Sequence, residues 1–390
     1  MNFDALTRFL DSLRGLYGIP ALDCIVNHGY RTVYRHAAGF SDAAGMRPVG
    51  PSDLYWIYSA TKVMTMTAVM QLIEHGRLRL EDELARYLPA FGDMYVAQGF
   101  TVEKSPARWP TRRDALRRAS TPIRVADLMS MTAGFSYDVD SEEIQAANAA
   151  AGGRATTRQM MDALARMPLI CEPGTRWAYS LSHDVLAGLV EAVSGLTFGE
   201  YLRRNLFSPL GISEAYFDLN EERLARLSAQ YRADDATGAI RPVPPVNRYR
   251  LSERYESGGA GLICTAEAYA AFVRAMSNGG VNEEGRRILT MASIDALRKN
   301  RLDARLLPDF AEMNKRGYGY GLGVRTLMDA NASRSPVGEF GWDGAAGAYV
   351  LMDPENRIGI FFAEHVLSFP QNYREIHPRL RDLVYEALLG

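Results

Sequence analysis

The chain has 390 residues, of which 47% are hydrophobic and 23% charged, and its formal net charge is -2 with a sequence pI near 6.4. This composition is typical of a soluble globular protein, and the length exceeds what one hydrophobic core usually supports, so we expect two or three lobes. The balanced charge gives no electrostatic reason to expect nucleic acid or an anionic membrane as a partner.

The three cysteines, Cys24, Cys171 and Cys264, lie far apart in the chain. An odd number without a Cys-x-x-Cys pair argues against a disulfide framework and a zinc site, and it is compatible with a reducing compartment. The first residues carry an early acid and no apolar core of signal-peptide length, and no stretch is long and apolar enough to span a bilayer. We therefore expect a cytoplasmic protein without a membrane partner.

The chain begins with a predicted helix and hairpin. Apolar residues recur at helical spacing over 3–17, after which glycine and proline break the pattern. Two β-rich segments, 23–27 and 31–37, follow, and the sequence at 27–30 is typical of a hairpin turn. A further helical pattern covers 61–76.

The middle of the chain, 80–246, is mostly helical in pattern and is interrupted by glycine and proline. Helices are predicted at 123–132, 157–167 and 182–194, the last ended by Gly195. This region is expected to form an insert beside a sheet.

The end of the chain is richer in strands. The elements predicted after residue 246 are, in chain order, a helix at 265–277, strands at 318–324, 348–352 and 358–363, and a helix at 373–389. Gly319, Gly321 and Gly323 are expected to lie within one strand, so they do not indicate a nucleotide-binding loop. The element order predicts an α/β fold of the α+β type, in which helices flank an antiparallel sheet completed by both chain ends.

The first candidate catalytic pair lies in Ser59-Ala60-Thr61-Lys62. A hydroxyl and an amine three residues apart lie on one face of a helix, so Lys62 can sit beside the Ser59 oxygen. Serine needs a neighbouring base or a stabilising field to act as a nucleophile, and burial lowers the pKa of an amine. The tetrapeptide alone is more typical of an exposed helix start with a capping serine, so its meaning depends on the rest of the chain.

Four further segments follow this tetrapeptide in order. They are Leu128-Met129-Ser130-Met131-Thr132-Ala133-Gly134, Pro173-Gly174-Thr175-Arg176-Trp177-Ala178-Tyr179-Ser180, Ser257-Gly258-Gly259-Ala260-Gly261-Leu262 and Gly341-Trp342-Asp343-Gly344. The five pieces together resemble the serine β-lactamase-related superfamily, and more closely its class C β-lactamase-like branch and the family VIII carboxylesterases. The resemblance covers nearly the whole chain. It implies the transpeptidase fold of β-lactamases and penicillin-binding proteins.

On that fold, we expect the chain to form two lobes. Residues 1–62 and 247–390 would make the α/β lobe with the central antiparallel sheet, and residues 63–246 would make a mostly helical lobe. The active site is expected between them.

The resemblance also implies catalytic roles. Ser59 would attack an acyl carbonyl and form an acyl-enzyme, and Lys62 would take part in proton transfer. Tyr179 matches the tyrosine of the family's second motif, and it is the other candidate base. Whether Lys62 or Tyr179 is the base in acylation stays open at the level of sequence.

An oxyanion hole needs two donors that point at one place. The resemblance supplies the backbone N–H groups of Ser59 and Ala345. Gly344, just before Ala345, would let the substrate carbonyl approach closely.

Two positions depart from the β-lactamase pattern. Leu181 stands where the second motif usually has asparagine, and Trp342-Asp343-Gly344 stands where the third motif usually reads Lys-Thr-Gly. An amide and an ammonium that help to bind a β-lactam or a peptide terminus are therefore missing. A tryptophan in the third motif is similar to the family VIII esterases and favours an uncharged acyl ester. The candidate substrate-binding residues are Trp342, Asp343, Gly344 and Leu181.

The sequence thus predicts a serine carboxylesterase-like hydrolase that acts on a small-molecule ester. The alternatives with the same machinery are a β-lactamase or amide hydrolase and an acyltransferase, and the alternative of another class is a catalytically silent binding protein. Asp343 is relevant to the silent binding protein, because its negative charge beside the oxyanion strand would repel the negative charge that develops on the substrate oxygen. On that hypothesis, Asp343→Gly would raise ester hydrolysis.

No cofactor and no metal are expected. His183 and Asp184 are adjacent in a predicted helix, so they face different directions and do not predict a Ser-His-Asp triad. The remaining histidines show no metal-ligand spacing, and they are His28, His36, His75, His365 and His377. The sequence leaves a homo-oligomer open.

Overall fold

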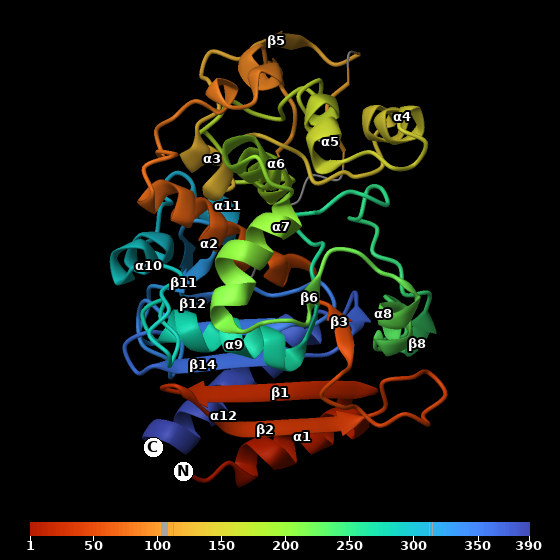
Figure 1. Ribbon diagram of the computed structural model, residues 1–390, viewed down its shortest axis with the longest axis vertical. Helices are drawn as coiled ribbons and strands as arrows, with labels where there is room; N and C mark the ends of the chain where they lie inside the picture. Colours follow the sequence, from red (N-terminus) through yellow and green to blue (C-terminus); the bar gives the residue numbers. More distant parts are fainter. Residues whose placement is uncertain (103–107, 112, 312, 314) are drawn as a thin grey trace.

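The computed structural model describes all residues except 103–107, 112, 312 and 314. Its centre is an antiparallel sheet of seven strands in the order β10-β11-β12-β13-β14-β1-β2 (Figure 1). The strands are β1 (Ala21–His28), β2 (Arg31–Gly39), β10 (Tyr318–Tyr320), β11 (Arg325–Leu327), β12 (Phe340–Gly341), β13 (Tyr349–Asp353) and β14 (Ile358–Ala363). The two ends of the chain therefore meet where β1 pairs with β14.

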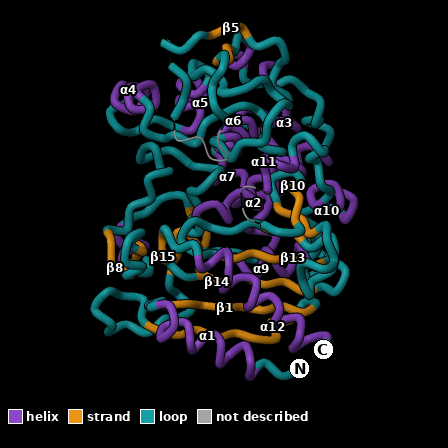
Figure 2. Tube along the Cα trace, turned by 180° about the vertical axis from the view of Figure 1, so that it is seen from behind, coloured by secondary structure: helices purple, strands orange, loops and turns teal. Residues whose placement is uncertain are grey.

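Helices cover both faces of this sheet. Successive strand residues point to opposite faces, so Val26 and Ile360 pack against α1 (Asp4–Tyr17) and α12 (His377–Leu389), whereas Phe361 packs against α9 (Ala266–Ser277). Figure 2 shows α1 and α12 in front of the sheet, and Figure 1 shows α9 on the other side. Burial on both faces explains why β14 is apolar throughout and why β1 is buried along nearly its whole length.

The other helices gather mostly at the end of the molecule away from β1 and β2 (Figure 1). They are α2 (Thr61–Glu74), α3 (Val125–Met129), α4 (Glu142–Ala150), α5 (Thr157–Leu164), α6 (Ser182–Ser194), α7 (Phe198–Leu202), α8 (Glu221–Arg226), α10 (Met291–Arg298) and α11 (Leu307–Ala311). Nearly every residue of α2 is buried, because it runs between α6 and the helices near the sheet. A helix buried on all sides is uniformly apolar, as α2 largely is.

Three small sheets complete the structure. Their strands are β3 (Leu54–Trp56), β9 (Ile263–Thr265) and β6 (Ala215–Tyr216), then β15 (Val366–Leu367), β7 (Gln230–Ala233) and β8 (Ile240–Val243), and then β4 (Tyr95–Ala97) and β5 (Leu116–Arg118). The pairing of β3 with β9 matters most for function, because it brings the segment before Ser59 next to residues 257–262.

The predicted fold class is confirmed by the antiparallel sheet flanked by helices. The hairpin of β1 and β2 and the helix 182–194 also agree with the sequence analysis. Several helices are shorter than predicted: α3 and α5 end at Met129 and Leu164, and α12 begins at His377 after a π-helical turn. The proposed lobe boundaries stay a prediction.

The single strand predicted over 318–324 is wrong. The structure has two strands, β10 and β11, joined by a turn in which Gly321 N–H donates to Val324 O at 2.8 Å. Gly323 adopts φ +76°, a conformation that glycine tolerates and that a strand does not use. The alternation of glycines thus marks a hairpin.

No single described helix is long and apolar enough to cross a membrane, whereas Ser182–Ser194 and Phe198–Leu210 reach that length and composition only as a pair bent by 72°. Among the residues that the structure covers, no group of three His, Cys, Asp or Glu side chains could hold a metal ion.

Candidate active site

Ser59 lies at the junction of strand and helix. The chain leaves β3, makes a 3-10 turn over Tyr58–Ala60 and enters α2. Tyr58 has φ 47°, which is unusual for a residue with a side chain and stores local strain. Its hydroxyl donates to Gln230 Oε1 at 2.9 Å, and this contact holds the turn. Ser59 itself is 7% exposed, so it is buried but keeps a small solvent-accessible surface.

Lys62 lies one helical turn beyond Ser59, as the spacing predicted. Its Nζ donates to Ser59 Oγ at 3.2 Å, to Tyr137 Oη at 3.3 Å and to Gly259 O at 2.7 Å. The side chain is fully buried. These three acceptors match the three N–H donors of an ammonium.

Two tyrosines flank the nucleophile. The hydroxyl groups of Tyr137 and Tyr179 both hydrogen-bond to the Ser59 side chain, and their rings lie 5.0 Å apart. The Lys62 ammonium also lies over the Tyr179 ring, 4.6 Å from its centroid. The structure therefore brings together Ser59, Lys62 and Tyr179 from two separate sequence segments and adds Tyr137 from a third.

Trp342 is directly coupled to this group. Its Nε1–H donates to the Tyr179 hydroxyl at 3.1 Å, and the two rings stack at 5.7 Å. Leu181, by contrast, is buried at the start of α6, where its N–H donates to Ser136 O at 3.0 Å. Trp342 thus takes up the space beside Tyr179, and contact of either residue with substrate stays a prediction.

Burial separates the acid-base properties of these groups. Desolvation lowers the pKa of Lys62 to about 7, although the nearby Asp184 carboxylate acts in the opposite direction. Desolvation raises the pKa of Tyr179, and it raises that of Tyr137 well above its usual range. Near neutral pH, Lys62 can therefore accept a proton, while both tyrosines hold theirs.

The turn 344–347 packs against the segment before Ser59. A methyl group added at Gly344 would lie 2.3 Å from Ile57 O, so this glycine permits two backbone segments to touch. The sequence analysis assigned that freedom to the approach of the substrate, but the space is occupied by Ile57. Among the described residues, none accepts a hydrogen bond from the half-buried Ala345 N–H, which is therefore available to an oxyanion.

The side chain of Asp343 is held in a buried ion cluster. It accepts hydrogen bonds from Arg325 Nη1 at 2.9 Å and from Lys315 Nζ at 2.5 Å. Burial alone would raise the pKa of Asp343, but the two cations hold it well below its usual range. Two positive charges thus compensate its carboxylate, which weakens the hypothesis that it repels the oxyanion.

We therefore expect Asp343→Gly to lower stability and not to raise turnover. The change leaves the Arg325 guanidinium, which is 2% exposed, without its carboxylate, and breaking a buried pair costs about 3 to 5 kcal/mol. Urea unfolding at pH 7 measures this loss. The matched control is Asp235→Gly in an exposed turn, which is expected to change the free energy of unfolding by less than about 0.5 kcal/mol. A higher kcat with unchanged stability would restore the repulsion hypothesis.

His183 and Asp184 do not form a triad with Ser59. Neither ring nitrogen of His183 has a hydrogen-bond partner in the described structure, and desolvation lowers its pKa well below the usual value. Asp184 instead accepts hydrogen bonds from Tyr255 Oη and Ser257 Oγ. The expectation that these two neighbours face different directions is confirmed.

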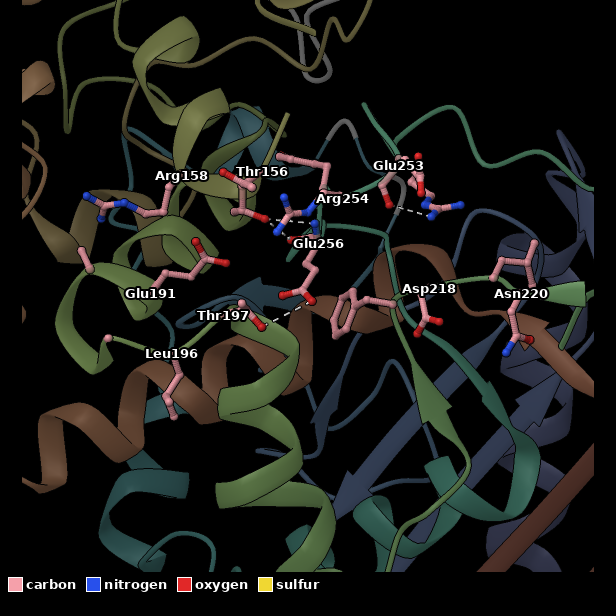
Figure 3. A pocket seen from close by; sticks show the side chains of 17 residues that line it. Thr156, Arg158, Glu191, Leu196, Thr197, Asp218, Asn220, Glu253, Arg254 and Glu256 are labelled. Carbon is pink, nitrogen blue, oxygen red and sulfur yellow. Dashed lines mark hydrogen bonds between the residues drawn. The ribbon is translucent and has the colours of Figure 1, made fainter. Parts of the chain in front are cut away.

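A large cavity lies beside helices α5 and α6 (Figure 3). It measures about 1050 Å³ and is lined by residues of α5, α6 and the segments 217–220 and 250–256. Arg158 and Glu191 of its lining come from α5 and α6, and Glu256 points toward Thr197. Its lining includes Tyr255, whose hydroxyl donates to Asp184, but Ser59, Lys62 and Tyr179 do not line it.

Tyr137 and Asp184 are the functional candidates that sequence reasoning missed. Tyr137 follows the segment 128–134, which resembled a family motif without carrying a role. A tyrosine three residues beyond that segment is a weak signal in a chain with 20 tyrosines. For Asp184, the sequence offers only its neighbour His183 as a possible partner.

Comparison with known proteins places this geometry in context. The family model described as Beta-lactamase matches residues 6–384. Lovastatin esterase of Penicillium rubens is 26% identical over 345 residues, which cover 87% of this chain and 76% of the esterase. The acyltransferase calJ of Penicillium decumbens is 25% identical over 362 residues, which cover 86% of this chain and 82% of that enzyme.

The solved structure of simvastatin synthase (LovD) from Aspergillus terreus, in its unliganded selenomethionyl form, superimposes with a TM-score of 0.81. The match covers 100% of both chains at 20% sequence identity. At this identity the likeness concerns the fold, and it confirms the transpeptidase-like architecture that the motifs predicted.

Proposed function

This chain belongs to the Beta-lactamase family, and on that premise we propose that it is a serine hydrolase that cleaves small carboxylic esters through an acyl-enzyme on Ser59. Esterases and acyltransferases are among its relatives. The observation that carries the proposal is the 3.2 Å contact between Lys62 Nζ and Ser59 Oγ in a buried pocket shared with Tyr179. This arrangement supplies a nucleophile, a proton acceptor and a proton donor.

Acylation begins with a neutral Lys62. Because its pKa is lowered to about 7, a large fraction of the amine is unprotonated at neutral pH and can take the Ser59 proton as Oγ attacks the carbonyl carbon. Tyr179 keeps its proton at this pH, since its pKa is raised. It gives that proton to the departing alkoxide as the carbon–oxygen bond of the ester breaks, and Lys62 then restores it through the pocket.

The carbonyl oxygen becomes negative in this step. The N–H groups of Ser59 and Ala345 are the donors that we assign to it, since the Gly344 turn is held against Ile57 beside Ser59. Water then attacks the acyl-enzyme by the reverse sequence of proton transfers, which releases the carboxylic acid.

The third motif supports an ester over a β-lactam. In place of an ammonium it presents the Trp342 indole, whose only polar atom already donates to Tyr179. The nearest lysine of that region, Lys315, is paired with Asp343. A substrate carboxylate therefore has no free cation at the third motif among the described residues.

A comparison of two chromogenic substrates tests this preference. We expect the protein to hydrolyse p-nitrophenyl butyrate with a kcat/KM at least about 100-fold above that for the cephalosporin nitrocefin, because a missing charge-assisted contact costs about 3 kcal/mol. Equal rates would favour the β-lactamase alternative. No hydrolysis of either would favour the silent binding protein.

Acyl transfer is the second candidate, favoured by the relative named as an acyltransferase. The same acyl-enzyme would be resolved by an alcohol. Addition of a primary alcohol during ester turnover, with the ester product measured by chromatography, distinguishes transfer from hydrolysis.

A further inference from the structure

Asp184 is a buried carboxylate behind the catalytic lysine. It lies on α6 and is 2% exposed. Tyr255 Oη donates to it at 2.9 Å and Ser257 Oγ at 2.6 Å, and the Gly259 N–H is a further donor. Burial raises the pKa of the Asp184 carboxyl, while these donors and the Lys62 ammonium act in the opposite direction and favour the carboxylate.

One peptide unit links Asp184 to Lys62. The N–H of Gly259 bonds to Asp184, and the C=O of the same residue accepts from Lys62 Nζ at 2.7 Å. A methyl group added at Gly259 would lie 2.4 Å from Asp184 Oδ2 and 3.5 Å from Lys62 Nζ. The two charged groups therefore lie within the range of about 6 Å over which opposite charges shift each other's pKa.

The segment that carries these donors is itself fixed from the other side. Glu256 N–H donates to Thr157 Oγ1 of α5 at 3.0 Å, and Glu256 Oε2 accepts from Gly199 N–H of α7 at 2.7 Å. Figure 3 shows Glu256 reaching toward Thr197, just before α7. Helices α5, α6 and α7 thus hold residues 255–259 where they connect the carboxylate to the amine.

Lys62 has no other carboxylate beside it in the described structure. The titratable groups that face it come from four segments: Tyr137 after α3, Tyr179 before α6, His183 and Asp184 on α6, and Tyr249 and Tyr255 from the segment 247–256. The tyrosines and His183 are neutral near pH 7, because burial raises the pKa of the tyrosines and lowers that of the histidine. Asp184 is the one carboxyl group of this set.

We propose that Asp184 is a positioning residue that fixes Lys62 beside Ser59 through the Gly259 peptide and supplies the charge that balances the ammonium. A buried ammonium without a counter-charge would lose its proton far below neutral pH and become a weaker base. With Asp184 in place, Lys62 can hold the proton that it takes from Ser59. This role rests on the proposed acyl-enzyme function, but the coupling of the two groups does not.

The composition of the chain permits a direct test. It contains four lysines, so protein labelled with 13C at the lysine Cε gives few signals, and Lys62→Met assigns one of them. We expect the Lys62 signal to titrate near pH 7 in the wild-type protein. In Asp184→Asn, which keeps the shape but not the charge, the midpoint is expected to fall by about 1 to 3 pH units.

The matched control is His183→Leu on the same helix. It removes a buried group that is neutral at pH 7 and unpartnered among the described residues, so the Lys62 midpoint is expected to stay in place. If Asp184→Asn fails to fold, Ser257→Ala removes one donor and keeps the carboxylate, and a smaller shift in the same direction is expected. An unchanged Lys62 midpoint in the folded variant would overturn the proposal.

Activity gives a second reading. In Asp184→Asn the acid limb of kcat/KM is expected to move to lower pH together with the NMR midpoint, and the plateau to fall about 10-fold or more because Lys62 is displaced. A merely structural residue would lower the plateau and leave the limb unmoved, which contradicts the proposal. Because the NMR titration needs no substrate, failure of the ester function would be seen separately, as inactivity of the wild-type protein.

Discussion

Replacing Ser59 with alanine is expected to lower the rate of p-nitrophenyl butyrate hydrolysis by about 10⁴-fold or more at pH 8. Removal of a nucleophile leaves only the binding and oxyanion contributions to the rate. Alanine fits in the space of serine, and the contact with Lys62 Nζ at 3.2 Å is the main one lost. The measurement compares purified wild-type and variant protein at equal concentration.

The matched control for this variant is Ser52→Ala, an exposed serine on the approach to β3. Its activity is expected to equal that of the wild-type protein. Equal rates in wild type and Ser59→Ala would remove Ser59 from the mechanism and leave another nucleophile to be found.

Replacing Lys62 with methionine is expected to lower kcat by about 10² to 10⁴-fold, the usual contribution of a general base. Methionine fills much of the volume of the lysine stem but cannot accept the Ser59 proton. Two effects on folding oppose each other: the change removes a buried amine whose pKa burial lowers, and it leaves the buried Asp184 carboxyl without its cation. An amine with a lowered pKa destabilises the folded protein most below about pH 7, where it is forced to carry its charge, and less as the pH rises.

The same change at the exposed Lys299 is the control and is expected to leave kcat unchanged. Thermal unfolding at pH 6 and pH 9 accompanies the kinetics. A loss of activity that tracks a loss of folded protein, and not the missing amine, would contradict the assignment of Lys62 as base.

The contact between Ser59 and Lys62 could be predicted because the relation of the two residues is local. A spacing of three residues on a helix fixes the distance between Ser59 and Lys62 whatever the rest of the fold does. Tyr179 was accessible through the motif around it. For Ser59 and Lys62 the spacing itself fixes the geometry, and for Tyr179 the surrounding motif identifies the residue.

The remaining contacts depend on the tertiary structure. Trp342 and Tyr179 are separated by 163 residues, and only the meeting of β12 with the segment before α6 creates their hydrogen bond. Tyr137 likewise reaches Lys62 from a loop, and Asp184 is linked to it through Gly259 of a distant segment; no periodicity in the sequence encodes either relation. Such contacts require the fold before they can be inferred.

The ion cluster at Asp343 could not be predicted because the strand predicted over 318–324 is wrong. A strand that continues through Val324, as the glycine alternation predicts, leaves Arg325 without a defined place. In the structure a turn ends at Val324, and Arg325 begins β11 opposite Gly341, two residues before Asp343. With the turn placed correctly, the alternation along β11 and β12 brings the two charges to one face.

The most direct test of the central claim is to trap the acyl group on the protein. Wild-type protein mixed with excess p-nitrophenyl butyrate and quenched in acid during turnover is analysed by intact mass and by peptide mapping. We expect a species heavier by one butyryl group, with the modification on the peptide that contains Ser59, and none in Ser59→Ala. A butyryl group on any other residue, or turnover with no acylated species even under rapid quenching, would contradict an acyl-enzyme at Ser59.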